Sequence, residues 1–230
     1  MSDTNQKTIP THVGIILDGN RRWAKAKGLS TLEGHLRGAE MIKRIGDAMA
    51  SRGIKYFTAY TFSTENWSRS KDEVKYLMAL ILKFLKKDII DLHKKGIRFR
   101  WLGEETNLSK KIISALKDAE ELTRNNKKAN INLCFNYGGQ NEIADACNKL
   151  IYRGKSVTTQ AISKALYGPD IPPLDLVVRT SGERRLSNFM LWRVAYSELY
   201  FTDIMWPDFN ETELDKALDD YNLRQRRFGG

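Results

Sequence analysis

The sequence predicts a single α/β domain with a largely parallel central sheet flanked by helices. Short apolar, β-branched or aromatic runs alternate along the chain with longer segments whose apolar residues recur at helical spacing. This alternation is typical of βαβ units, in which a helix connects two parallel strands. The 230 residues contain no internal repeat or low-complexity linker, and 41% of them are hydrophobic, which is enough for one substantial core.

The strand and helix candidates follow one another in chain order. The predicted strands, rich in β-branched and aromatic residues, are 12–17, 56–61, 97–102, 130–136, 174–179 and 199–202. The predicted helices are 21–27, 34–52, 71–95, 109–125, 140–151, 159–166, 187–196 and 211–222. We expect a flexible N-terminus at 1–11, one domain at 12–230, and an internal loop at the Pro-rich segment 168–173.

The long helix predicted at 71–95 has two readings. Its apolar residues form one continuous stripe, made of Val74, Leu77, Met78, Ile81, Leu82, Leu85, Ile89 and Leu92. Such a stripe ordinarily packs on the sheet. Alternatively, part of it lines a hydrophobic tunnel for the apolar tail of a ligand.

Composition and charge narrow the classes of function. Cys134 and Cys147 do not form a Cys-x-x-Cys pair and only three histidines occur, so a zinc site is not expected and the chain is typical of a reducing, cytoplasmic protein. The N-terminus lacks the apolar stretch of a signal peptide, and the longest apolar run, 76–82, is too short to span a bilayer. The net charge of +10 favours an anionic partner: a nucleic acid, a membrane surface or a polyphosphate.

The segment directly after the first predicted strand is the most informative. Residues 18–22 read DGNRR and lead into a predicted helix, an arrangement with which α/β proteins hold phosphates. Asp18 stands among the cations Arg21, Arg22 and Lys25, which indicates a metal ion and a polyphosphate bound together. The ordinary alternative is a helix that begins with Asp18 as its N-cap.

Other predicted strands also end in polar segments, namely 62–69, 136–140 and 179–188. Because the carboxyl ends of parallel strands meet at one edge of the sheet, we expect these segments to lie together. They carry Asp, Asn, Ser, Gly and Arg, with no pairing of a nucleophile and a histidine. The composition therefore favours binding of anionic oxygens over acyl transfer.

Ordered blocks of this sequence resemble the cis-prenyltransferases, whose best-known bacterial branch is the undecaprenyl diphosphate synthases. The resemblance extends from about residue 12 to residue 230, and the blocks that carry it are 18–25, 34–35, 62–69, 136–139, 175–183, 185–192, 198–201, 206–209 and 226–230. It implies the fold of those synthases, with a hydrophobic tunnel. It also implies a Mg²⁺-dependent condensation of isopentenyl diphosphate with an allylic diphosphate such as farnesyl diphosphate. The default product is undecaprenyl diphosphate, the lipid carrier of cell-wall synthesis.

The resemblance also implies roles for individual residues. Asp18 would bind Mg²⁺, with Glu198 as a second carboxylate near the metal, and Asp18 and Asn66 would be catalytic. Backbone groups of the first motif and Arg22 would bind the allylic diphosphate, and the Arg179 region would bind isopentenyl diphosphate. The full set of implied substrate-binding residues is Gly19, Asn20, Arg21, Arg22, Trp23, His35, Ser63, Glu65, Trp67, Arg69, Arg179, Arg185, Ser187 and Arg227.

The same resemblance implies a homodimer, because the C-terminal element around Arg227 reaches the neighbouring subunit's site in the family. We expect a cytoplasmic enzyme, with peripheral contact at the inner face of the membrane left open. A nucleic-acid partner is not expected, since it would explain the charge but not the loops at Asp18 and Asn66. Without the resemblance, His35 would be interpreted as a structural histidine. Trp67 is equally well explained as a core residue, and Glu183 as a residue that orients arginines.

Three positions depart from the family pattern. Arg21 stands where many bacterial members have Gly, and Thr31 stands where the family usually has an Arg that contacts the allylic diphosphate. The missing arginine leaves an alternative open: a short-chain or irregular, head-to-middle synthase of the lavandulyl type on the same fold. Thr61 stands where relatives often have Ala beside the tunnel, and its larger side chain favours a shorter product.

Overall fold

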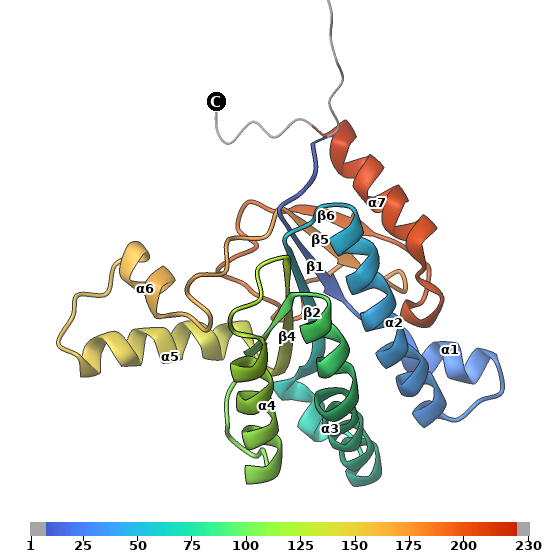
Figure 1. The fold of residues 1–230 in the computed structure, drawn as a ribbon, viewed down its shortest axis with the longest axis horizontal. Coiled ribbons are helices and arrows are strands. Elements are labelled where there is room, and N and C mark those ends of the chain that lie inside the picture. The colour runs from blue at the N-terminus through green and yellow to red at the C-terminus, as the bar shows by residue number, and fades with distance from the viewer. Residues whose placement is uncertain (1–7, 225–230) are drawn as a thin grey trace, which may run out of the picture.

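Six parallel strands form the sheet at the centre of residues 8–224, the part of the chain that the computed structural model describes (Figure 1). The strands are β1 (His12–Ile16), β2 (Tyr56–Ser63), β3 (Ile97–Leu102), β4 (Ala129–Tyr137), β5 (Leu176–Arg179) and β6 (Glu198–Phe201). Their order across the sheet is β3-β4-β2-β1-β5-β6, and every neighbouring pair is parallel. The predicted α/β class and all six predicted strands are confirmed.

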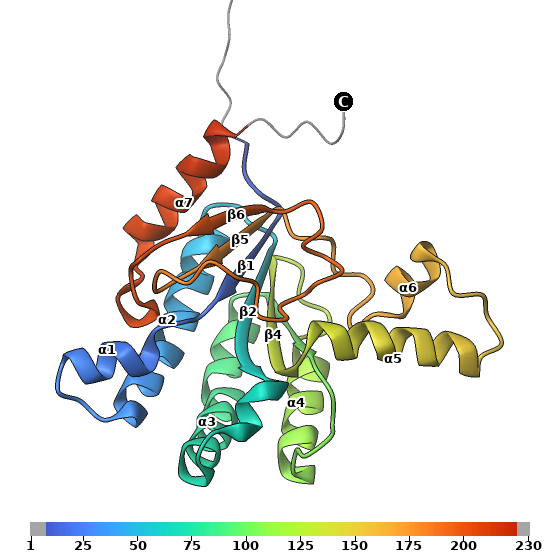
Figure 2. The same ribbon diagram turned by 180° about the vertical axis from the view of Figure 1, so that it is seen from behind.

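Seven α-helices and two short 3₁₀ helices accompany the strands in residues 8–224, and two of these helices follow the last strand. The α-helices are α1 (Asn20–Ala26), α2 (Thr31–Ser51), α3 (Lys71–Lys94), α4 (Lys110–Thr123), α5 (Gly139–Tyr152), α6 (Thr159–Ala165) and α7 (Glu211–Leu223). The 3₁₀ helices are η1 (Thr64–Ser68) and η2 (Trp206–Asp208). Helices α2, α3, α4 and α7 cover one face of the sheet, whereas α5 and α6 extend away from the body of the domain (Figures 1 and 2).

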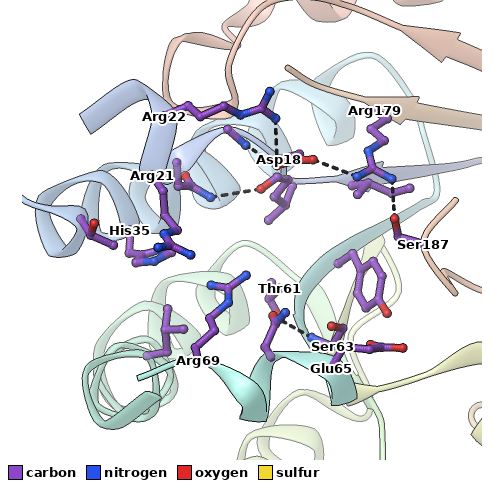
Figure 3. Close-up of a pocket in the computed structure, with 18 of the residues that line it drawn as sticks. Asp18, Arg21, Arg22, His35, Thr61, Ser63, Glu65, Arg69, Arg179 and Ser187 are labelled. Carbon is purple, nitrogen blue, oxygen red and sulfur yellow. Dashed lines mark hydrogen bonds and ion pairs between the residues drawn. The ribbon is translucent and has the colours of Figure 1, made fainter. Parts of the chain in front are cut away.

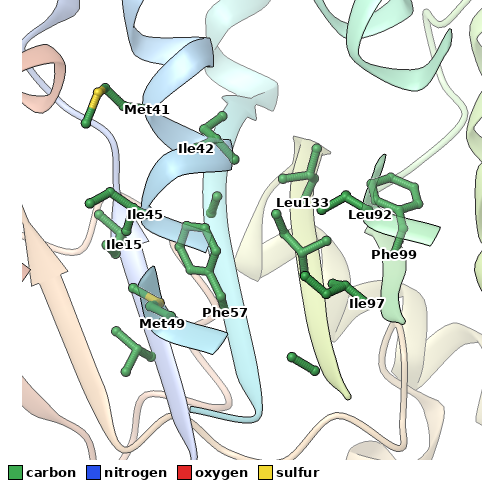
Figure 4. Packing of buried hydrophobic residues seen from close by; sticks show 14 of the residues in the cluster. Ile15, Met41, Ile42, Ile45, Met49, Phe57, Leu92, Ile97, Phe99 and Leu133 are labelled. Atoms are coloured by element: carbon green, nitrogen blue, oxygen red, sulfur yellow. The ribbon is translucent and has the colours of Figure 1, made fainter. Parts of the chain in front are cut away.

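The main core lies between the sheet and the layer of α2, α3 and α4. Ile15 of β1, Phe57 of β2 and Leu133 of β4 pack against Met41 and Ile45 of α2, and all five are at most 3% exposed (Figure 4). A smaller cluster fills the other face, where Tyr60, Cys134 and Val177 meet residues of the loops before and after β5. With both faces covered, β1 is buried at every position, as expected for a central parallel strand.

The helix predicted at 187–196 is wrong. This segment forms consecutive turns, because Ser187, Asn188 and Met190 have φ angles of 47°, 66° and 41°, in the left-handed region that a right-handed helix excludes. Its apolar residues Phe189 and Met190 are fully buried on the second face of the sheet. The apolar pattern that predicted a helix therefore belongs to a buried loop.

The chain ends bear on two predictions. The predicted flexible N-terminus falls mostly on residues 1–7, which lie outside the described residues. Within the described part, the Thr11 backbone N–H already donates to Asp175 Oδ2 at 2.8 Å, which ties the chain to the start of β5. Across residues 8–224, no helix combines the length and apolar character needed to traverse a bilayer.

Candidate functional site

A cavity of about 1210 Å³ opens at the carboxyl ends of β1, β2 and β5 (Figure 3). Its walls come from α1, the first turns of α2, η1 and the loop that follows β5. The structure therefore brings together polar segments that are up to 170 residues apart in the sequence. The predicted site residues that line this polar cavity are Asp18, Gly19, Asn20, Arg21, Arg22, His35, Ser63, Glu65, Asn66, Arg69, Arg179 and Ser187.

Gly19 sets the geometry of the first motif. Its φ of 106° is a conformation that favours glycine, and it turns the chain from β1 into α1. A Cβ at this position would also lie 2.9 Å from Cβ of Ser181 and 3.0 Å from Cβ of Met205. Only glycine fits this turn, which places Asp18 at the floor of the polar cavity.

Asp18 lies between two arginines. Its Oδ2 accepts a hydrogen bond from Arg179 Nη2 at 2.8 Å, and its Oδ1 accepts from the Gly19 N–H at 2.7 Å and lies 3.4 Å from Arg22 Nη2. Burial raises the pKa of the Asp18 carboxyl, but the hydrogen bond and charge of Arg179, aided by Arg22, outweigh it and hold that pKa below its usual value. The carboxylate is therefore ionised at neutral pH. It is not capping α1, whose N-cap is Gly19.

Arg179 keeps an unused donor. The residue is 4% exposed; its Nη1 donates to Ser187 Oγ at 2.8 Å and to the Arg185 carbonyl oxygen. Its Nε is buried and has no hydrogen-bond partner in the described structure. An unpaired donor on a buried cation that lines a cavity favours an anionic ligand there.

Glu183 orients arginines, as one reading of the sequence proposed. Its Oε1 lies 3.2 Å from Arg22 Nη1 and its Oε2 lies 2.5 Å from Arg185 Nη1. Arg22 also donates to Ser181 Oγ at 2.6 Å. The Arg185 side chain is 60% exposed and does not line the polar cavity in this structure, unlike Arg22.

The opposite wall is the loop after β2. The Asn66 side-chain oxygen accepts from the N–H of Ser63, the N-cap of η1, at 3.1 Å, and this bond holds Asn66 in one orientation. Glu65 Oε1 accepts from Asn188 Nδ2 at 3.0 Å, which links this loop to the turn after β5. Asn188 lines the cavity too, although it was not among the predicted site residues.

A second, apolar cavity of about 100 Å³ adjoins the first between α2, α3 and the sheet. Its walls include Ile42, Leu80, Ile81, Phe84, Leu133, Phe135 and Trp206. The residues that line both cavities are Leu17, Asn20, His35, Thr61 and Leu77. The α3 stripe is therefore divided: Leu77 and Ile81 line the apolar cavity, whereas Leu85, Ile89 and Leu92 pack in the core. That the apolar cavity takes the tail of a ligand stays a prediction.

Four predicted site residues among those described line neither cavity: Trp23, Trp67, Arg185 and Glu198. Trp23 is a buried residue of α1, Trp67 donates from Nε1 to Asn136 Oδ1 at 2.7 Å and packs on Phe62, and Arg185 is exposed. Arg227 lies outside the described residues.

Glu198 lies at the amino end of β6, away from Asp18. In the sheet it pairs with Leu176, whereas Arg179, beside Asp18, pairs with Phe201 three positions further along β6. Its carboxylate contacts Arg224 Nη1 at 3.0 Å. Within one chain, the geometry does not support binding of one metal ion by both Asp18 and Glu198, and that assignment stays a prediction.

Comparison with known proteins identifies the family. Residues 16–229 match a prenyltransferase family model described as "Putative undecaprenyl diphosphate synthase". The chain belongs to this family. It is 50% identical to an isoprenyl transferase of Fusobacterium nucleatum over 98% of both chains. It is 44% identical to a trans,polycis-polyprenyl diphosphate synthase, (2Z,6E)-farnesyl diphosphate specific, of Thermobifida fusca, over 98% of this chain and 82% of that one.

Two solved structures share the fold over nearly the whole chain. One is lavandulyl diphosphate synthase from Lavandula x intermedia in complex with dimethylallyl diphosphate, with a TM-score of 0.92 and 36% identity over 96% of this chain and 99% of that one. The other is a probable undecaprenyl diphosphate synthase from Campylobacter jejuni, with a TM-score of 0.83 and 26% identity over 97% and 100%. The fold and the prenyltransferase class implied by the motifs are thus confirmed.

Proposed function

We propose that this protein is a Mg²⁺-dependent cis-prenyltransferase that condenses isopentenyl diphosphate with an allylic diphosphate. The observation that carries the proposal is the ionised Asp18 held between Arg22 and Arg179, in a polar cavity that adjoins an apolar one. Two diphosphate heads require several cations and the hydrocarbon tail requires an apolar wall. This pair of cavities offers both.

In the proposed reaction the C–O bond of the allylic diphosphate breaks, and the diphosphate leaves with the electron pair. The alkene of isopentenyl diphosphate forms the new C–C bond, and loss of one proton forms the new double bond. The chain contributes positioning and charge. Arg179 and Ser187 bind one diphosphate, and Arg22 with the backbone of Gly19 binds the other, so that the two reacting carbons are held close together.

The residues of the polar cavity fit a magnesium ion. Mg²⁺ in proteins is commonly held by one or two carboxylates together with substrate phosphates, and Asp18 supplies an ionised, half-buried carboxylate. Among residues 8–224 there is no group of three or more His, Cys, Asp or Glu side chains that would hold a metal without substrate. When bound at Asp18, Mg²⁺ would reduce the negative charge on the leaving diphosphate.

The proposed product is a long polyprenyl diphosphate, with undecaprenyl diphosphate as the default, because several relatives are named isoprenyl transferase and one polyprenyl diphosphate synthase. We further propose a cytoplasmic homodimer in which Arg227 completes the partner's site, with product release at the inner face of the membrane.

One observation favours a second candidate, the irregular coupling of two allylic units. Thr31 lines the polar cavity where the family usually has an arginine, so the allylic diphosphate has one cation fewer. The high similarity to a lavandulyl synthase structure is compatible with that chemistry.

The test is turnover with defined substrates in the presence of Mg²⁺. We expect farnesyl diphosphate with labelled isopentenyl diphosphate to give labelled polyprenyl products, resolved by chain length on a reversed-phase column. Dimethylallyl diphosphate alone should give none. Product from dimethylallyl diphosphate alone would establish the irregular coupling, and no product from either mixture would refute the proposed function.

A further inference from the structure

Asn188 joins three loops at one end of the polar cavity. It belongs to the turn that follows β5, and its backbone carbonyl oxygen accepts a hydrogen bond from the Gly139 N–H at 2.7 Å. Its side-chain Oδ1 accepts from the Gln140 N–H at 2.8 Å, and its Nδ2 donates to Glu65 Oε1 at 3.0 Å. Gly139 and Gln140 begin α5, whereas Glu65 lies in η1 after β2. One residue therefore connects the segments that follow β2, β4 and β5.

These contacts account for the glycines of the block 136–139, to which the proposed reaction gives no role. A Cβ at Gly139 would lie 2.8 Å from the Asn188 carbonyl oxygen. A Cβ at Gly138 would lie 3.0 Å from Asn188 Nδ2 and 2.8 Å from Thr64 Oγ1. Neither glycine has a positive φ angle, so these positions require the absence of a side chain rather than backbone freedom. The two glycines allow the close approach of Asn188.

The turn that contains Asn188 also contains Ser187. Both residues have φ angles in the left-handed region, 47° at Ser187 and 66° at Asn188, which is unfavourable for residues other than glycine. The three hydrogen bonds of Asn188 hold the turn in this conformation. Ser187 Oγ accepts in turn from Arg179 Nη1 at 2.8 Å. The position of the Ser187 hydroxyl, and its contact with Arg179, therefore depend on Asn188.

The contact between Asn188 and Glu65 is charge-assisted. Burial raises the pKa of the Glu65 carboxyl, but the hydrogen bond from Asn188 and bonds within its own loop outweigh it and hold that pKa below its usual value. The carboxylate is therefore ionised at neutral pH. Figure 3 shows Glu65 and Ser187 at the same end of the cavity, remote from His35. Both polar groups of the Asn188 side chain have partners in the protein, so its influence on a substrate acts through the residues that it holds.

We propose that Asn188 is a positioning residue for isopentenyl diphosphate: it holds Ser187 in the conformation in which Ser187 and Arg179 bind this diphosphate, and it fixes Glu65 at the same end of the cavity. This inference rests on the proposed function, with isopentenyl diphosphate as the diphosphate bound at Ser187 and Arg179. In a purely structural role, by contrast, loss of the Asn188 contacts would lower stability without distinguishing between the two substrates.

The first test compares Asn188→Asp with Asn107→Asp. In Asn188→Asp the side chain keeps its size and its acceptor for the Gln140 N–H, but an oxygen faces the Glu65 carboxylate. We expect KM for isopentenyl diphosphate to rise about 10- to 100-fold, the range typical of leaving a charge-assisted hydrogen bond unmade. KM for the allylic diphosphate should change less than about threefold. Asn107 is a matched control, because it also has a left-handed φ angle, 64°, and lines neither cavity.

A double substitution separates this contact from other effects of the new charge. When Asn188→Asp is combined with Glu65→Gln, the donor and the acceptor are exchanged, because the glutamine amide can donate to the aspartate. We therefore expect Asn188→Asp to raise KM for isopentenyl diphosphate less than about threefold when Glu65→Gln is already present. An equal rise in both backgrounds, or no rise in the wild-type background, would overturn the proposal. So would an equal rise of KM for both substrates.

The exposed residue Gln140 offers a test that places no new charge in the cavity. Gln140→Pro removes the N–H that donates to Asn188 Oδ1, and proline is tolerated in the first turn of a helix, where Gln140 lies. Gln140→Ala is the matched control, because it loses the side chain but keeps the N–H. We expect KM for isopentenyl diphosphate to be about 3- to 10-fold higher in Gln140→Pro than in Gln140→Ala. Equal KM values would overturn the proposal, even if Asn188→Asp failed to fold.

Calorimetric titration distinguishes failure of this inference from failure of the proposed function. If the wild type turns over but the variants behave as their controls, only the role of Asn188 is refuted. If the wild type makes no prenyl product, the proposed function is refuted, and the Kd of isopentenyl diphosphate in Gln140→Pro and Gln140→Ala decides the inference. Equal Kd values, or no binding to the wild type, would then overturn it.

Discussion

The two cavities meet at His35, Thr61 and Leu77 but are built in different ways. The polar cavity is lined by segments that follow strand ends, and its charged groups are fixed by one another, as in the contacts of Asp18 with Arg179 and Arg22. The apolar cavity is lined by faces of α2, α3 and the strands, with the same residue types as the core beside it. Head recognition therefore depends on a few individual side chains, whereas tail recognition depends on the space that many side chains leave.

The largest effect should come from Asp18, on which the polar cavity is centred. Asp18→Ala removes the carboxylate that contacts both Arg22 and Arg179, so we expect kcat to fall by about 10³-fold or more at saturating Mg²⁺. Steady-state turnover measures this, and circular dichroism should show an unchanged fold because Arg179 keeps its bonds to Ser187 and Arg185. Magnesium-dependent turnover at the wild-type rate would refute the assignment.

A smaller loss is expected from Arg179→Lys, because lysine keeps the charge but loses the planar guanidinium that contacts Asp18 and Ser187 together. Loss of one charge-assisted hydrogen bond, about 1.5–3 kcal/mol, corresponds to a fall of about 10- to 100-fold in kcat/KM for isopentenyl diphosphate. Arg153→Lys, an exposed change at the end of α5, is the control. A loss below twofold in Arg179→Lys would remove this arginine from the diphosphate clamp.

Residues at the boundary of the two cavities should control product length, with little effect on binding of the diphosphate groups. Thr61→Leu adds bulk where both cavities meet, so we expect shorter products and a change in KM below about threefold. Chromatography of the chain lengths measures it. Thr61→Val is the matched control, because it keeps the size and removes only the hydroxyl that donates to the Cys134 carbonyl at 2.9 Å. Unchanged lengths in Thr61→Leu would contradict a role of the apolar cavity in tail binding.

The smallest expected effect is the change in KM when the ionic strength is raised. Charges in the polar cavity are partly open to solvent, and the Debye length falls from about 10 Å at 0.1 M to about 3 Å at 1 M. We therefore expect KM for the diphosphates to rise a few-fold between these salt concentrations, while the distribution of chain lengths stays constant. A salt-dependent chain length would mean that head and tail recognition are not separate.

This difference between the cavities also explains what could be predicted from sequence. The polar segments were recognisable because charged residues directly after buried strands are unusual in a core. Asp18, Arg179 and Ser187 line one cavity, as their positions after strand ends predict. The sequence could not predict which apolar residues line the apolar cavity, because Leu77 and Leu85 belong to the same stripe. Only the packed structure separates the cavity wall from the core.

Two further failures have local causes. The segment at 187–196 has the apolar content of a helix, but its left-handed residues Ser187, Asn188 and Met190 are of types whose φ no sequence pattern fixes. The contact between Glu73 Oε1 and His35 Nε2, at 2.9 Å, was overlooked because Ser70-x-x-Glu73 has the pattern of a capping box, as Ser30-x-x-Glu33 does. The signal was the distant His35, which only the fold brings to Glu73.

The sheet order determines when in folding the polar cavity can appear. Asp18 and Arg179 are 161 residues apart, and they meet only when β5 pairs with β1, on the opposite side from β2. Closing so long a loop carries a large entropic cost, and parallel pairing over such separations is slow. During synthesis the sheet of β1 to β4 can form first, but it holds half a diphosphate site. We therefore expect the diphosphate-binding groups of β1 and β5 to come together only after β5 has been made.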